Sequence, residues 1–187
     1  MEPAKPIPPA HPVSHPVSPA VGAALPIDAI DRIRAAWAEV RPDVDTAPAG
    51  TIGRIQRAAH HVRAQSDEVL QRFGIGRVEF DVLSAVRRSP VPLTPSDVAR
   101  QLLASNAAIT KRMVQLEASG LAERSRSATD GRVVQVSLTA AGIDCVDAAL
   151  PATLDFERSI EAVLDAGERV VLESLLRRIL NELETRA

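Results

Sequence analysis

The stretch TPSDVARQLLASNAAITKRMVQLEASG, residues 94–120, contains two helix start signals eleven residues apart. Thr94 is a good N-cap, Pro95 suits the first helical position, and Asp97 completes the spacing of a capping box. Ser105 is a second N-cap, and Gly120 is placed to end the helix that follows it. Two short helices joined by a tight turn predict a helix-turn-helix, with the second as recognition helix.

The predicted recognition helix has two different faces. Ile109, Met113 and Leu116 repeat at i, i+4 and i+7 and predict its buried side. Small, hydrogen-bonding side chains and one cation lie opposite, near the helix N-terminus, where base edges and phosphates are read in DNA complexes. The DNA-binding residues predicted on this helix are Ser105, Asn106, Ala107, Thr110 and Lys111.

A short hairpin is predicted directly after this helix. The segments 121–127 and 133–139 read as strands, and the sequence ATDG at 128–131 is a turn with Asp-Gly chemistry. A two-stranded hairpin behind a recognition helix is a wing, whose tip can reach a groove or a phosphate. Arginines stand on both sides of this tip, so we add Arg126, Asp130 and Arg132 to the predicted DNA contacts.

The charge distribution supports the same partner, double-stranded DNA. The chain has a net charge of −2, but residues 94–137 carry six basic and four acidic side chains, a local charge of +2. A solvated face would explain such a stretch if it stood alone; its arrangement on a helix-turn-helix and wing favours DNA binding. The near-neutral total disfavours a constitutive DNA-architectural protein.

Outward from this centre the periodicity is helical. We expect helices over 27–40, about 51–73 and 76–88, with a break through Pro42 and Pro48 between the first two. A helix starting after Thr139 meets Pro151, where a kink or break is expected, and a last helix follows Asp165. Its apolar stripe is wide for a helix with one neighbour: Val170, Val171, Leu175, Leu176, Ile179 and Leu183.

The predicted fold class is mainly α with a small β-hairpin wing, a winged helix-turn-helix with a further helix at its N-terminal end. Residues 1–26 hold eight of the chain's fourteen prolines and are expected to be a disordered tail, for which a solvated role is favoured over a ligand for a proline-reading module. Residues 27–187 are expected to form one domain. Its parts are the DNA-binding region at 76–142 and the helices on either side of it, at 27–73 and 143–187.

Composition argues against several other functions. No apolar run approaches the length of a membrane span, and the N-terminus lacks the pattern of a secretory signal, so a cytoplasmic location is expected. No phosphate-cradling loop is present, and His60 and His61 point about 100° apart on a helix, which excludes a shared metal. Asp81 lies oddly in an apolar stretch but has no visible catalytic partner. We therefore expect no enzyme activity, no cofactor and no metal.

The single cysteine, Cys145, leaves two interpretations open. A lone cysteine excludes an internal disulfide and fits a reducing compartment. It is more often a small core residue than a peroxide sensor, although sensing of oxidation stays an alternative.

The wing and its flanks resemble the multiple-antibiotic-resistance regulator (MarR) family of winged-helix repressors. The family's wing pattern is Asp-x-Arg, a strand, then Leu-Thr-x-x-Gly, which this chain matches at Asp130, Arg132, Leu138, Thr139 and Gly142. The resemblance extends from about Thr51 to Arg186. It implies a homodimer joined by the first and last helices, here near 51–73 and 143–185.

A narrower resemblance points to the urate-responsive subgroup of that family. The subgroup adds an N-terminal helix with a tryptophan, often followed by RPD-x-D, which corresponds here to Trp37 and RPDVD at 41–45. The ligand residues of the subgroup correspond to Asp81 in EFDVL, Arg112 in ITKRM and Arg124 in LAER. The match in ITKRM is the loosest, because Lys111 stands where an Asn is common in the subgroup. The implied ligand-binding residues are Trp37, Asp81, Arg112 and Arg124.

These four residue types suit a flat, anionic purine. Trp37 would supply an aromatic wall, and Arg112 and Arg124 would supply bidentate cationic donors. Asp81 would be repelled by the anion or would lose an arginine partner to it. Because Arg112 lies on the predicted recognition helix, a movement of Arg112 would also move the surface that reads DNA. A plain structural ion pair between Asp81 and Arg112 is the alternative. The implied function is a repressor released from its operator by urate or a related purine; the alternative is release by a phenolic or lipophilic aromatic compound, or by oxidation.

Overall fold

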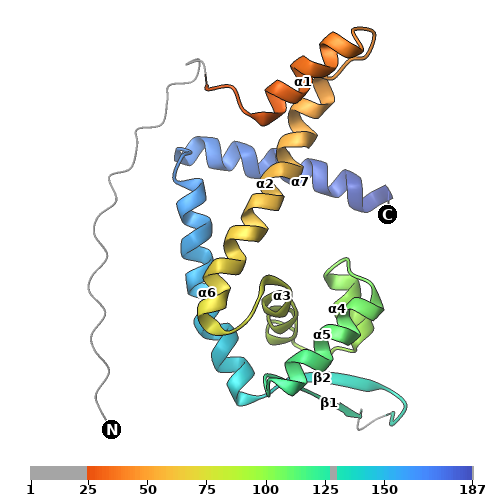
Figure 1. Cartoon of the computed structure of the whole chain (residues 1–187). Helices are drawn as coiled ribbons and strands as arrows, with labels where there is room; N and C mark the ends of the chain where they lie inside the picture. Colours follow the sequence, from red (N-terminus) through yellow and green to blue (C-terminus); the bar gives the residue numbers. More distant parts are fainter. Residues whose placement is uncertain (1–24, 127–129, 187) are drawn as a thin grey trace, which may run out of the picture. The chain divides into compact units, whose positions relative to one another are not determined.

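The computed structural model describes residues 25–126 and 130–186, which form seven α-helices, one 3-10 turn and one hairpin (Figure 1). This confirms the mainly helical fold with a hairpin wing; the predicted proline-rich tail and the tip of the wing turn, 127–129, lie outside the described residues. In chain order the elements are α1 (Ala29–Val40), α2 (Ala47–Leu70), η1 (Gln71–Phe73), α3 (Arg77–Arg87), α4 (Pro95–Gln101), α5 (Asn106–Ala118), β1 (Ala122–Arg126), β2 (Val134–Leu138), α6 (Ala140–Glu161) and α7 (Ala166–Arg186).

The chain divides into two compact units, Pro26–Phe156 and the residues from Glu157 onward. In the first unit α3 is the central helix and contacts α2, α4, α5 and β2. Phe80, Val82, Leu83 and Ala85 of this helix are all buried. The side chains that surround α3 in this core include Leu70, Val98, Ile109, Met113, Leu116, Val136 and Val146.

The helix-turn-helix forms as its sequence signals predict. Thr94 Oγ1 accepts the backbone N–H of Asp97 at 3.1 Å, and Asp97 Oδ2 accepts that of Thr94 at 3.0 Å, so the capping box is present. Ser105 Oγ accepts the N–H of Ala108 at 3.2 Å and caps α5. Both side chains occupy positions where helical N–H groups have no backbone partner, which fixes where each helix begins.

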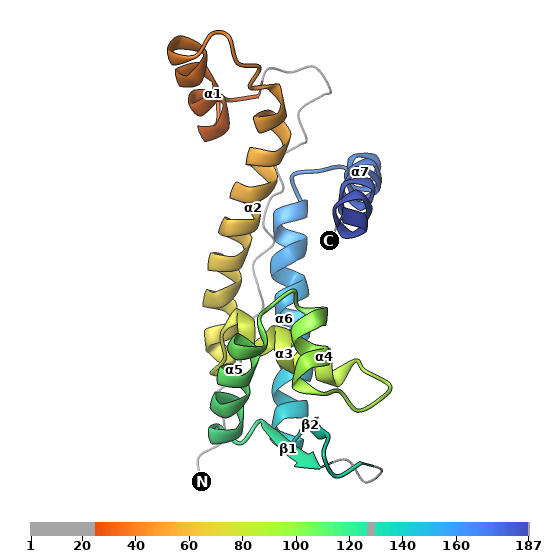
Figure 2. The same ribbon diagram turned by 90° about the vertical axis from the view of Figure 1, so that its right-hand side faces the viewer.

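The wing is an antiparallel pair whose register runs from Ala122 opposite Leu138 to Arg126 opposite Val134. Its base is tied to the core by a third segment, because the N–H of Val136 donates to the carbonyl of Leu93 at 2.8 Å. Figure 2 shows the two strands below α3 and α6. The hairpin is therefore held to the core at its base.

The junction between wing and α6 depends on Gly142. Thr139 Oγ1 donates to the carbonyl of Gly120 at 2.7 Å and accepts the N–H of Gly142 at 3.0 Å. A Cβ at Gly142 would lie 1.9 Å from the carbonyl oxygen of Leu121, far inside any van der Waals contact. The Leu-Thr-x-x-Gly sequence thus lets the start of α6 approach the backbone that leads into β1.

The extra helix α1 is attached to the N-terminal half of α2. Arg54 of α2 bridges Asp28 and Asp31 with contacts of 2.7 Å to each carboxylate. Ile30 is buried against Gly53, which leaves room for it because a glycine has no side chain. The pKa of Asp28 is lowered by hydrogen bonds from the backbone N–H of Asp31 and from Arg54, and the Arg54 guanidinium lowers the pKa of Asp31. Both carboxylates therefore stay charged partners of Arg54.

Two proline predictions were wrong in detail. α2 begins at Ala47, ahead of Pro48, because a proline in the first helical turn loses no hydrogen bond. α6 runs from Ala140 to Glu161 through Pro151, so of the expected kink or break the break does not occur. At the other end of α2, Gly74 has φ of +72°, the left-handed conformation expected of a glycine that ends a helix.

The second unit is dominated by α7, and none of the residues of this helix is buried. Its apolar side chains are exposed along the whole helix: Val170, Val171, Leu172, Leu175, Leu176, Leu180 and Leu183. Within the described residues, no helix is both long enough and apolar enough to cross a bilayer.

Candidate DNA interface and effector site

The outer face of α5 is free of protein contacts that would bury it. Ile109, Met113 and Leu116 are buried in the core, while Asn106, Ala107, Thr110 and Lys111 are exposed on the opposite side. The hydroxyls of the N-terminal turn are engaged within the helix: that of Ser105 caps it, and that of Thr110 donates to the carbonyl of Asn106 at 2.8 Å. The exposed face is therefore compact and rich in small side chains, which lets a helix enter a groove.

The described part of the wing presents charge near its tip. Arg126 ends β1 and is exposed, and Arg132 is exposed on the other side of the turn. Asp130 Oδ1 accepts the N–H of Arg132 at 3.0 Å, and the carbonyl of Asp130 accepts the N–H of Val133 at 2.9 Å. Asp130 thus shapes the turn that carries Arg132, whose guanidinium can extend toward a phosphate.

The four predicted ligand residues lie on four different elements. Asp81 on α3 pairs with Arg77, one helical turn earlier, at 2.9 Å. Arg112 on α5 pairs instead with Glu79. The alternative of an Asp81–Arg112 ion pair is therefore wrong, because Glu79 occupies Arg112 and Arg77 occupies Asp81.

Glu79 is a residue of this region that the sequence pattern did not predict. It lies in the first turn of α3, and both it and Arg112 are mostly buried, with side-chain exposures of 20% and 30%. The contact joins the recognition helix to the central helix across 33 residues of sequence. An anion that binds Arg112 has to compete with the Glu79 carboxylate.

Arg124 is held in a second, bidentate contact. Its Nε and Nη2 groups donate to the two carboxylate oxygens of Glu117, each at 2.7 Å. These hydrogen bonds to Glu117 raise the pKa of Arg124 above its ordinary value. This pair connects the end of α5 with β1, so Arg112 and Arg124 tie the recognition helix to two different neighbouring elements.

Trp37 is separated from the other three residues. α1 passes α2 from Gly53 toward Thr46, since Ile30 contacts Gly53 and Arg34 donates to the carbonyl of Thr46. α3 instead meets the opposite end of α2, where Asp67 accepts the N–H of Arg77. The helical rise from Gly53 to Asp67 is roughly 21 Å. Within Pro26–Phe156, Trp37 is 54% exposed and is not brought to Asp81, Arg112 or Arg124, as Figure 2 shows for α1 and α3.

Cys145 has the environment of an inert thiol. It is partly buried against the core, and its Sγ lies 3.7 Å from the carbonyl of Phe73, to which it can donate. Burial raises the pKa of this thiol. Because the thiolate is the form that reacts with peroxide, this environment does not favour the alternative of oxidation sensing.

His60 and His61 are adjacent residues of α2. Their rings meet edge to face with centroids 5.7 Å apart. Among the described residues, no group of three or more His, Cys, Asp or Glu side chains is arranged to hold a metal ion.

Comparison with known proteins gives a consistent result. A profile of the MarR family matches residues 73–133. The HTH-type transcriptional regulator PecS of Dickeya dadantii is 29% identical over 145 residues, which cover 76% of this chain and 87% of PecS. An uncharacterized HTH-type transcriptional regulator of Bacillus subtilis, YdgJ, is 26% identical over 59% of this chain and 66% of its own length.

Solved structures match over most of their length. A mutant of MarR from E. coli is 25% identical and superposes with a TM-score of 0.62 over 73% of this chain and 99% of its own. A MepR–DNA complex of S. aureus, 22% identical, superposes with a TM-score of 0.66 over 71% of this chain and 97% of MepR. At 22% identity, the match to MepR shows a similar fold and nothing more.

Proposed function

We propose that this chain is a winged helix-turn-helix transcriptional regulator of the MarR family, and that it acts as a homodimeric repressor released from its operator by an anionic purine. The observation that carries the DNA-binding part is the exposed face of α5 beside the arginines of the wing. Two such faces in a twofold dimer would enter successive major grooves, and half-sites would lie about 10 bp apart. A DNase footprint on a bound promoter fragment tests this directly, since a footprint without twofold symmetry contradicts it.

The wing supplies a prediction about salt. Arg132→Ala should weaken binding to all DNA sequences by a similar factor, because a phosphate contact carries no sequence information. The slope of log K against log salt concentration should become shallower by about one unit for each phosphate that is no longer neutralised. Titrations of a fluorescent duplex at several salt concentrations measure both effects. Arg178→Ala, which removes one exposed arginine from α7, should leave the slope unchanged; equal slopes for all three proteins contradict the assignment of Arg132.

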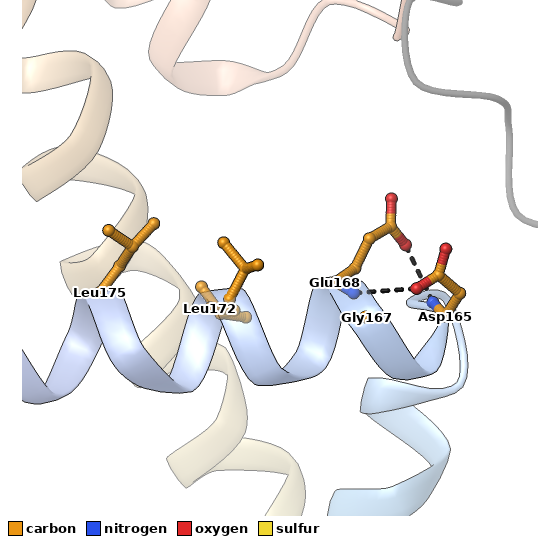
Figure 3. A pocket seen from close by; sticks show the side chains of 6 residues that line it. Asp165, Gly167, Glu168, Leu172 and Leu175 are labelled. Atoms are coloured by element: carbon orange, nitrogen blue, oxygen red, sulfur yellow. Dashed lines mark hydrogen bonds between the residues drawn. The ribbon is translucent and has the colours of Figure 1, made fainter.

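The proposed dimer rests on the exposed apolar side of α7. At the start of this helix the capping box of Asp165 and Glu168 borders a hollow of about 520 Å3, lined by Val171, Leu172 and Leu175 (Figure 3). A helix with this many exposed aliphatic side chains needs a partner, because large apolar patches on stable monomers are rare. A second copy of this chain is the occupant that the twofold operator requires.

For the effector we propose an anion bound by Arg112 and Arg124, with Asp81 at the same site. Both arginines already hold carboxylates, Glu79 and Glu117, so an anion with two acceptor edges could replace either. Since Arg54 fastens α1 to the other end of α2, Trp37 can complete this site only from the second subunit. The proposed effector site is thus shared between subunits.

Urate and xanthine should lower operator affinity by about five- to 150-fold at saturation, the usual range of allosteric coupling. Trp37 is the only tryptophan, so its fluorescence should change on binding. Arg112→Ala and Arg124→Ala should lose the response, and Trp37→Phe should weaken the ligand while operator affinity stays nearly the same. Glu79→Gln should respond at lower purine concentration, because the competing charge is gone.

One control compound and one negative outcome make this test decisive. Salicylate, measured in parallel, separates the purine from the phenolic alternative. The purine proposal would be wrong if neither the Trp37 fluorescence nor the operator gel shift changed in millimolar urate, xanthine or hypoxanthine.

A further inference from the structure

We infer that the recognition helix reads the 5-methyl groups of thymines in its operator. The inference rests on the proposed DNA binding and adds the class of base contact that this helix makes. Hydrogen bonding is the usual expectation for the start of a recognition helix; the side chains exposed here point to methyl contacts instead.

Three residues on the outer face of α5 present methyl groups in one row. Ala107, Thr110 and Val114 are spaced i, i+3 and i+7, so they share one side of the helix. This side is opposite the buried Ile109 and Met113. Val114 is 51% exposed although it is β-branched and aliphatic. An aliphatic side chain on the groove-facing side of a recognition helix can contact DNA only through apolar groups.

Thr110 belongs to the same row because its hydroxyl is engaged elsewhere. The hydroxyl donates its only hydrogen to the carbonyl of Asn106 at 2.8 Å. It can still accept a hydrogen bond, but it has no hydrogen left to offer a base acceptor. The methyl group is the part of this exposed side chain that is not engaged within the helix, so Thr110 resembles Val114 more than it resembles a serine.

Leu103, in the turn before α5, is a further exposed aliphatic side chain near the N-terminal end of this row. It is 87% exposed, and its φ of +50° lies in the left-handed region, where it is the one non-glycine among the described residues with positive φ. Such a conformation is strained for a leucine, and glycine would avoid that strain. Because the Leu103 side chain is so exposed, it contributes little to packing within the described protein. This is consistent with a contact that it makes only when DNA is bound. The turn lies two residues before the cap of α5, at the edge of the groove that α5 would enter.

Thymine is the base that offers a matching group. Its C5 methyl is the one apolar feature among the base edges of the major groove, and alanine, threonine and other methyl-bearing side chains pack against it. A row of methyl groups along α5 therefore selects thymines at neighbouring positions of a half-site, while Asn106 and Lys111 remain beside the row for polar contacts.

Replacing thymine by uracil removes this methyl and leaves the base pairing intact. We would select duplexes from a random library with the wild-type dimer and then substitute each thymine of the half-site by uracil, one at a time. At least one substitution should weaken binding about three- to fivefold, the factor expected for one buried methyl group. Thr110→Ser, which removes only the methyl, should bind the thymine duplex more weakly and lose its preference over the uracil duplex at one position.

Thr110→Val is the matched control, because it keeps a methyl in place and removes the hydroxyl; its preference for thymine should be retained. Val114→Ala should lose the preference at a different position. Leu103→Gly should raise Tm by relieving the left-handed leucine and should still bind the operator more weakly. Wild-type binding that is equal for every uracil substitution would overturn the inference. Failure to select any duplex would instead contradict the proposed DNA binding, so the two failures are distinguishable.

Discussion

A Gly142→Ala variant is expected to lose about 3 kcal/mol of unfolding free energy, at the upper end of the cost of forcing one extra group into a packed site. The added Cβ would lie 1.9 Å from the carbonyl oxygen of Leu121. Neither partner can move alone, because the obstacle is backbone and not the end of a side chain. The Leu121 carbonyl also accepts the N–H of Thr139 at 3.2 Å, so a shift that relieves the clash weakens this hydrogen bond.

Thermal unfolding followed by circular dichroism measures the effect, which should appear as a decrease in Tm of roughly 6 to 12 °C for a chain of this length. Gly131→Ala is the matched control, since a Cβ there meets nothing within 4 Å. The two variants receive the same extra methyl, and only the first should be destabilised. Equal Tm values for both variants would show that the junction between the wing and α6 accommodates the added methyl group without loss of stability.

The second large effect concerns the subunit contact. Leu176→Glu would place a charge within the exposed apolar side of α7, and the proposed dimer should dissociate because an unpaired carboxylate cannot be buried cheaply. Operator affinity should then fall on the order of 100-fold or more, since a monomer loses the gain from binding two half-sites at once. Sedimentation velocity and operator titration measure the two results independently.

Arg178→Glu is the control for this variant. Positions 176 and 178 differ by about 200° around the helix, so the same acidic side chain is placed on the opposite side of α7. This variant should remain a dimer with wild-type operator affinity. A wild-type chain that sediments as a stable monomer at micromolar concentration would remove the basis of the dimer proposal.

The helix-turn-helix and the wing could be predicted because their signals are local. Thr94 and Ser105 cap helices within three residues of themselves, and the apolar-polar alternation of the sequence marks strand β2, in which Val136 is buried. The buried side of α5 also follows from spacing alone, as the burial of Ile109 confirms. A pattern that extends over one or two helical turns needs no knowledge of the tertiary structure.

The ion pairs could not be predicted in the same way. Asp81 stands out in the sequence because it interrupts an apolar stretch, yet the carboxylate that meets Arg112 belongs to Glu79. Which of two acids on one helix faces a distant arginine depends on the rotation of α3 against α5, and that rotation is set by core packing. The position of Trp37 depends likewise on Arg54, whose partners lie 23 and 26 residues away.

The partly buried thiol of Cys145 makes this chain convenient for site-specific labelling. Alkylating dyes react with the thiolate, and burial raises the pKa of this group, so it stays protonated at neutral pH. It is also the only cysteine in the sequence. A cysteine introduced on an exposed residue such as Ser125 would therefore take up a maleimide fluorophore ahead of Cys145, and the native cysteine need not be replaced. Distances between two wings in a labelled dimer could then be followed by energy transfer as ligand or operator is added.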